Sequence, residues 1–179
     1  NLSLTRAIAI NPIEPLYHDE DASTLSLLAS VAMTNRDATA AGTFARESIK
    51  ENDRAIEISP ANVNFWKTRT KILYAFTPFD PTFIKAAITA LEKAHDLSPN
   101  DPKIIYNLAI LEGQNGENQK AIEFLKTAID LKPNYRDAYW ALHIFYKETG
   151  SRELSQNVLS EYLSKVDPND REFREARTQ

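Results

Sequence analysis

The stretch AITALEKAHDLSP at residues 87–99 returns as AIEFLKTAIDLKP at residues 121–133. Alanine, isoleucine, leucine and proline occupy the same places in both copies, and the shift is 34 residues throughout. Apolar residues at intervals of three and four lie on one face of a helix, and proline cannot continue a helix interior. Each copy therefore predicts an amphipathic helix whose alanines let another helix backbone approach closely.

Weaker copies of the end of this pattern occur as AIAINP at 7–12, AIEISP at 55–60 and LSKVDP at 163–168. Two further apolar stripes at helical spacing lie between the copies, each followed by a glycine, Gly116 or Gly150. The stripes consist of Ile104, Ile105, Leu108 and Leu111, and of Ala138, Tyr139, Leu142, Phe145 and Tyr146. Because glycine tolerates the left-handed backbone that often ends a helix, the unit is predicted to be a helical hairpin.

This unit resembles the tetratricopeptide repeat. The residues that carry the resemblance are Leu108, Ala109, Gly116, Ala121, Leu125, Ala128 and Pro133. The next unit fits less well, because Ser155 and Tyr162 replace expected small residues, and in the preceding unit Arg69 and Thr70 replace expected packing residues. The resemblance covers nearly the whole chain. It implies an all-α fold, a right-handed superhelix of helical hairpins (an α-solenoid).

The spacing of the prolines that end the units predicts which units are irregular. Successive spacings are 48, 39, 34 and 35 residues. Pro78 and Pro81 predict a lengthened turn within 75–82, whereas 17–33 and 38–58 predict two elongated helices. We therefore expect a single solenoid over 1–179. Its parts are a partial repeat (1–12), an elongated repeat (13–60), a repeat with a long turn (61–99), a regular repeat (100–133), a further repeat (134–168) and a partial capping helix (169–179), which Asp170 can cap and which has no hairpin partner.

Composition excludes several classes of protein. The 179 residues carry a net charge of -4 without a basic block, which argues against nucleic-acid binding. There is no cysteine, so no disulfide framework or thiolate metal site is expected. No apolar run approaches the roughly 18 residues that would span a bilayer. The chain starts without a signal peptide, directly in its first helical pattern, and we expect it to be a fragment of a larger protein.

No motif for catalysis is present. His18, His95 and His143 lack partners at zinc-ligand spacing, and we expect them to be surface or groove residues. The acidic run 19–21 is expected to be a solvated face near a helix start, where carboxylates complement the helix dipole. Glycine-rich phosphate loops are absent. The sequence therefore predicts no enzyme, no catalytic residue, no cofactor and no metal.

The resemblance implies a binding surface instead. In tetratricopeptide proteins the first helix of each hairpin lines the concave face, and its inward residues hold ligand peptides. The corresponding positions here are Asn64, Lys67, Lys71, Tyr74, Lys103, Tyr106, Asn107, Ile110, Asp137, Trp140, Ile144 and Lys147. This mixture suits an extended peptide that carries a carboxylate. Alternatively, Trp140 and Tyr106 simply pack between adjacent hairpins.

Heat-shock cochaperones of this family bind peptide carboxylates with a clamp of basic and amide residues. Lys67 and Asn107 match that clamp, but Lys71 stands where asparagine is expected. Asp137 replaces a lysine, and Ala141 replaces the last basic residue. One charge is therefore reversed, and we do not expect chaperone tails to bind.

Two stretches, 62–70 and 131–139, resemble the C-terminal repeat regions of bacterial O-antigen ligase/polymerase-type membrane proteins. That resemblance implies a soluble accessory domain of a membrane glycan ligase or polymerase, with the transmembrane part upstream. Two functions therefore stay open: an interaction module that binds a partner polypeptide on its concave face, and such an accessory domain, which organises the complex without catalysis of its own. A purely structural spacer is a third option.

Overall fold

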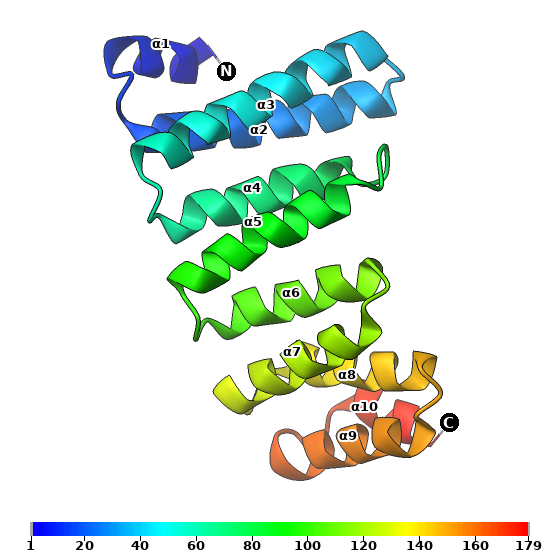
Figure 1. The fold of residues 1–179 in the computed structure, drawn as a ribbon. Coiled ribbons are helices and arrows are strands. Elements are labelled where there is room, and N and C mark those ends of the chain that lie inside the picture. The colour runs from blue at the N-terminus through cyan, green and yellow to red at the C-terminus, as the bar shows by residue number, and fades with distance from the viewer. Residues whose placement is uncertain (1, 179) are drawn as a thin grey trace. The chain divides into compact units, whose positions relative to one another are not determined.

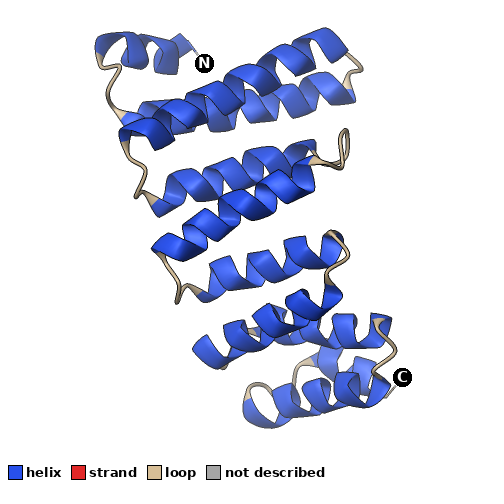
Figure 2. Cartoon of the chain, in the orientation of Figure 1, coloured by secondary structure: helices blue, strands red, loops and turns tan. Residues whose placement is uncertain are grey.

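A computed structural model describes residues 2–178, and over these residues every regular element is a helix (Figures 1 and 2). The prediction of an all-α fold is confirmed. The chain divides into two compact units, unit 1 (Asn1–Ser98) and unit 2 (Pro99–Gln179). The right-handed superhelix stays a prediction. The helices are α1 (Leu2–Ile10), α2 (Pro15–Thr34), α3 (Ala38–Ile58), α4 (Val63–Phe76), α5 (Phe83–Leu97), α6 (Pro102–Gln114), α7 (Asn118–Leu131), α8 (Arg136–Glu148), α9 (Arg152–Lys165) and α10 (Arg171–Arg177).

Unit 1 consists of two helical hairpins and the short helix α1. Helices α2 and α3 lie side by side over 20 and 21 residues, the elongated helices that the proline spacing predicts. Helix α4 packs against both of them and pairs with α5, while α1 contacts α2. The long turn between α4 and α5 covers 77–82, where Asp80 accepts hydrogen bonds from the backbone and hydroxyl of Thr82 at 2.9 and 2.7 Å. The turn therefore has its own hydrogen bonds.

Unit 2 repeats the hairpin twice, as α6 with α7 and α8 with α9, and α7 packs against α8. The final helix α10 packs against α9, with Phe173 fully buried. The Phe173 ring stacks on Tyr162 at 3.8 Å between centroids and meets Trp140 edge-on at 5.1 Å. Asp170 caps the helix by accepting from the Phe173 amide at 3.2 Å, as its sequence position indicates. Helix α10 therefore covers aromatic side chains of α8 and α9.

The repeated alanines lie at the helix contacts in both units. Ala87 and Ala94 of unit 1 and Ala121 and Ala128 of unit 2 are all 0% exposed. A methyl side chain lets two helix backbones approach, while larger residues fill the groove beside it. The leucine before each repeat-ending proline behaves differently. Leu97 and Leu131 are 40% and 42% exposed, so these two repeated positions are not part of the core.

A buried polar network joins the first three long helices of unit 1. The Asn52 side chain on α3 is fully buried, and its Nδ2 donates to Asp19 Oδ1 on α2 at 3.0 Å and to the Phe65 carbonyl at 3.1 Å. Thr68 donates to Asp19 Oδ2 at 2.9 Å, and Arg69 Nε donates to Asn52 Oδ1 at 2.5 Å. Arg69 thus replaces an apolar packing residue of the repeat because its guanidinium satisfies a buried amide.

This network corrects the prediction that 19–21 is a solvated face. Asp21 is buried, and Asp19 is half-buried among its hydrogen-bond partners. Burial raises the pKa of Asp19, while the hydrogen bonds from Thr68 and Asn52 oppose that shift. Asp19 therefore supplies a structural anchor for α3 and α4, whereas Glu20 is exposed as predicted.

The prediction of surface or groove histidines was wrong for His18, which is 5% exposed. Its Nδ1 lies 2.6 Å from Glu51 Oε2 and its Nε2 lies 3.0 Å from the Pro12 carbonyl oxygen. His143 is also buried, at 4% exposed, but lines a pocket of unit 2. Burial of a histidine between hydrogen-bond partners leaves no periodic signal in the sequence.

The turns inside three hairpins share a left-handed residue. Gly116 after α6 and Gly150 after α8 have φ of 89° and 77°, and Arg36 occupies the same place after α2 with φ 61°. An added Cβ at Gly116 meets no atom within 4 Å, so the cost of a side chain there comes from the backbone alone. Gly42, inside α3, has ordinary helical geometry and only the flexible Arg46 side chain near its Cβ position, at 3.5 Å.

We predict opposite effects for the same chemical change at these two glycines. Gly116→Ala should destabilise the protein by about 1 kcal/mol, because an L-residue resists the left-handed backbone. Gly42→Ala should stabilise it by up to about 1 kcal/mol, because alanine loses less backbone entropy in a helix. Urea unfolding followed by circular dichroism measures both. A stabilising Gly116→Ala would contradict the turn geometry.

The polar network generates a second prediction. Asn52→Ala should lower the free energy of unfolding by about 2–3 kcal/mol, because Arg69 Nε loses its acceptor, and Asp19 Oδ1 and the Phe65 carbonyl lose the donor that Asn52 supplies. Asn157→Ala is the control, since Asn157 is exposed on α9, and should change stability by less than about 0.5 kcal/mol. Equal effects of the two substitutions would show that the network contributes nothing.

Candidate functional site

The sequence-predicted binding residues of unit 1 form one stripe on α4. We call this stripe the α4 face; it consists of Asn64, Lys67, Lys71 and Tyr74. Three of the four are exposed, and Lys67 is partly exposed. The opposite side of α4 is buried through Phe65 and Ile72. The positive charge of Lys71 lies close enough to Asp19 to oppose the burial-driven rise of that carboxyl's pKa.

The remaining predicted residues form a second surface, within unit 2. We call it the α6/α8 face; it consists of Lys103, Tyr106, Asn107, Ile110, Asp137, Trp140, Ile144 and Lys147. All eight are exposed or partly exposed. Their helices bury the other side, through Ile104, Leu108 and Ala109 on α6 and Ala138 and Leu142 on α8. Both helices are amphipathic: their apolar sides are buried in the core, so the side that carries this face is exposed to solvent.

The α6/α8 face is continuous because its two helices meet closely. A Cβ built on Gly113 of α6 would lie 2.1 Å from Phe145 Cζ of α8, so a larger residue at 113 would require the Phe145 ring to move. At the other end, the negative charge of Asp137 on α8 is near enough to Tyr106 on α6 to raise its pKa, an effect second to burial. Residues 31 apart in the sequence thus become neighbours.

The aromatic residues of this face have structural contacts as well. Tyr106 lies 5.2 Å from Tyr135 between ring centroids, and Trp140 packs against His143 at 5.3 Å and against Phe173. Packing between helices, the alternative that the sequence left open, therefore accounts for part of both side chains. Each nevertheless keeps an accessible surface. Ile110 and Ile144 are also partly exposed, on the same stripes.

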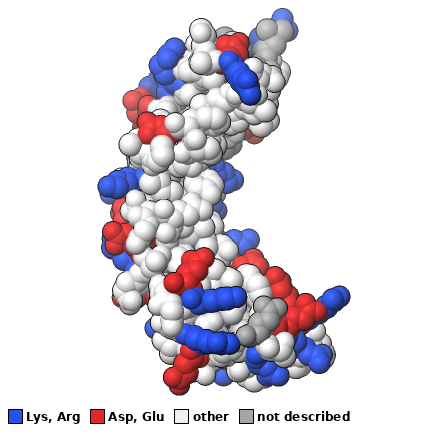
Figure 3. Space-filling model, turned by 90° about the vertical axis from the view of Figure 1, so that its right-hand side faces the viewer, with Lys and Arg blue, Asp and Glu red and all other residues white. Residues whose placement is uncertain are grey.

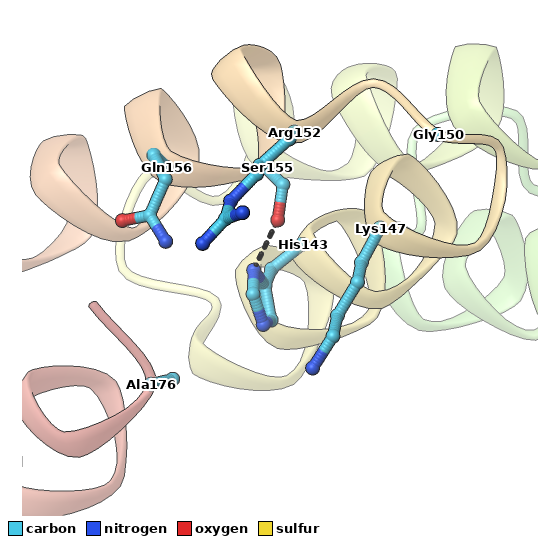
Figure 4. Close-up of a pocket in the computed structure, with 7 residues that line it drawn as sticks. All are labelled: His143, Lys147, Gly150, Arg152, Ser155, Gln156 and Ala176. Atoms are coloured by element: carbon cyan, nitrogen blue, oxygen red, sulfur yellow. Dashed lines mark hydrogen bonds between the residues drawn. The ribbon is translucent and has the colours of Figure 1, made fainter. Parts of the chain in front are cut away.

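Sequence reasoning missed a pocket at the carboxyl end of α8. It has a volume of about 330 Å³ and is lined by side chains of α8, α9 and α10 (Figure 4). His143 and Lys147 come from α8, and Arg152, Ser155 and Gln156 come from α9. Ser155 Oγ lies 2.7 Å from His143 Nδ1. The signal was Ser155 itself, a polar residue at a position where the repeat expects a small apolar one.

Charged side chains of both signs are mixed on one side of unit 2. Figure 3 shows acidic and basic side chains interspersed over unit 2 on the side that it presents. The α6/α8 face holds two lysines and one aspartate. Such a surface does not have the basic footprint of a nucleic-acid site.

Neither a metal centre nor a membrane span is found over residues 2–178. Within these residues no group of three or more histidine and carboxylate side chains is arranged to hold a metal ion. In the same part of the chain, no helix combines the length and the hydropathy that crossing a bilayer requires.

Comparison with known proteins shows which repeat family part of the chain resembles. Residues 84–143 match the family model of the tetratricopeptide repeat. No curated protein shows significant similarity to the sequence. The matched residues run from α5 to α8 and include the alanines buried at the helix contacts. These residues are therefore similar to tetratricopeptide repeats.

Solved structures share the fold at low sequence identity. MamA is 19% identical, with a TM-score of 0.65 over 98% of this chain and 86% of its own. TTC0263, a thermophilic TPR protein of Thermus thermophilus, is 16% identical, with a TM-score of 0.61 over 98% and 85%. YrrB, described as a TPR protein with an unusual peptide-binding site, is 17% identical, with a TM-score of 0.60 over 98% of each chain. The described chain thus has the fold of tetratricopeptide-repeat proteins.

Proposed function

We propose that this chain is a protein-interaction module whose α6/α8 face binds a partner polypeptide in an extended conformation. The observation that carries the proposal is the composition of that face. Tyr106, Ile110, Trp140 and Ile144 supply partly exposed apolar surface, and lysine, asparagine and aspartate side chains are exposed on the same two helices. Protein interfaces commonly combine an apolar centre, rich in aromatic side chains, with a polar rim.

The packing of the aromatic rings favours binding. Tyr106 and Trp140 are held by Tyr135, His143 and Phe173, so their rings are oriented before a partner arrives. A ring that is already fixed loses little conformational entropy on binding, and its exposed edge still contributes apolar area. The packing contacts of Tyr106 and Trp140 therefore also fix the ring orientations that a partner would bind.

The relatives support the same class of function. The match to the tetratricopeptide repeat at residues 84–143 includes the whole of α6 and the first half of α8. YrrB, which shares the fold, carries a peptide-binding site according to its description. The α4 face of unit 1 is proposed as a further contact surface, because Asn64, Lys67, Lys71 and Tyr74 are accessible on a helix of the same type.

The accessory domain of an O-antigen ligase-like membrane protein remains the second proposal. It rests on the sequence resemblance of 62–70 and 131–139. Both stretches have structural roles here: Trp66 Nε1 donates to the Pro60 carbonyl at 2.8 Å, and Tyr135 is buried beneath Tyr106 and Lys132. These roles account for the residues without a shared parent. Hydrophobic spans in the reading frame upstream of the chain would favour the accessory domain.

The interaction proposal predicts that apolar side chains of the face are required for partner capture. Ile110→Asp and Ile144→Asp should each reduce recovery of the main partner from a native extract by at least about tenfold, because a carboxylate cannot replace apolar contact area. Leu154→Asp is the matched control, since Leu154 is 46% exposed on α9 and lies outside the face. It should capture the partner as the unmodified chain does.

Quantitative mass spectrometry of the captured proteins measures the effect, and circular dichroism checks that each variant is folded. Equal recovery with all three variants and the unmodified chain would rule out the α6/α8 face as the binding surface.

A further inference from the structure

The pocket at the carboxyl end of α8 has the lining of an anion site. Lys147 and Arg152 contribute two positive charges, and Gln156 and Ser155 contribute polar groups. Among the described residues that line the pocket, none is acidic. Figure 4 shows the side chains of Lys147, Arg152 and Gln156 extending to the same side, toward the space beside Ala176 of α10. Two cations and an amide thus converge on one small volume.

His143 adds a donor at the floor of this pocket. Its ring is buried, and Nδ1 is paired with Ser155 Oγ at 2.7 Å. Burial lowers the pKa of His143, the hydrogen bond with Ser155 opposes that shift, and the nearby Lys147 charge adds to it, so the net effect favours the neutral imidazole. When the serine hydroxyl donates to Nδ1, the proton of a neutral ring is on Nε2. Nε2 lies on the ring edge opposite Ser155, from which it can donate toward an anion (Figure 4).

We propose that this pocket binds a carboxylate of the partner polypeptide, supplied by an Asp or Glu side chain. Guanidinium, ammonium and amide donors are the groups that bind carboxylates in proteins. The volume of about 330 Å³ is at the lower end of the range for small-molecule sites, so it suits one side chain.

The inference rests on the proposed function, because Lys147 belongs to both the pocket and the α6/α8 face. A polypeptide that lies along α8 past Ile144 therefore reaches the pocket without leaving the protein surface. The apolar part of the face would hold the peptide, and the pocket would select an acidic residue at one position. This arrangement differs from the cochaperone clamp, whose positions carry Asp137 and Ala141 here, since the pocket uses α9 residues.

The test is a selection of random 12-residue peptides displayed on phage against the immobilised full chain. Selected peptides should share an acidic residue. Changing that residue to its amide should weaken binding by about tenfold, the effect of one charge-assisted hydrogen-bonded contact. Isothermal titration calorimetry with the synthetic peptides measures the affinities.

Gln156→Glu is the diagnostic variant, because it places a negative charge in the pocket but lies outside the α6/α8 face. It should lower the affinity for the acidic peptide by about tenfold and leave the affinity for the amide peptide unchanged. This is the result expected for removal of a single electrostatic contact. Gln119→Glu, an exposed position on α7, is the matched control and should bind both peptides as the unmodified chain does.

The outcomes separate the two proposals. If the selected peptides lack an acidic residue, or if Gln156→Glu weakens acidic and amide peptides equally, the carboxylate pocket is wrong. In that case Ile110→Asp and Ile144→Asp decide the proposed function: it stands if they abolish peptide binding. A selection that yields no binding peptide contradicts both proposals.

Discussion

Close approach of helix backbones at buried alanines is the constraint on which both units depend. Ala87 and Ala94 in unit 1 and Ala121 and Ala128 in unit 2 have no accessible surface. Their methyl groups set how near the neighbouring helices come, and this spacing determines which side of each helix is left for solvent. The exposed stripes of α4, α6 and α8 lie on the sides of these helices that face away from the helix contacts. The accessible surface of this fold is therefore a consequence of how α5 and α7, the second helices of their hairpins, pack against their neighbours.

The hairpins could be predicted from the sequence because periodic signals specify them. The 34-residue repeat predicted α5 and α7 with their prolines, and the spacing of prolines predicted the long α2 and α3 hairpin and the 77–82 turn. Accessible positions on α6 and α8 followed from the same periodicity, and all eight are at least partly exposed. Whether a partner uses them stays a prediction.

The rest depends on contacts between residues far apart in the chain. Nothing in the local sequence of Asp19 indicates that Asn52 and Thr68 will donate to it, 33 and 49 residues away. Departures from the repeat were the only signal, since Arg69 and Ser155 both stand at packing positions and both bond to buried polar groups. A residue that breaks a repeat pattern is therefore worth examining for a polar partner.

Adjacent alanines on α5 offer the most direct measurement of the central claim. Ala87 is fully buried, whereas Ala86 is exposed. Ala87→Leu should lower the free energy of unfolding by about 1–3 kcal/mol, because three added carbon atoms overpack the helix contact. Ala86→Leu should change it by less than about 0.5 kcal/mol, since the side chain points to water. Urea unfolding measures both variants. If Ala87→Leu were as stable as Ala86→Leu, the claim that buried alanines set the helix contacts would be contradicted.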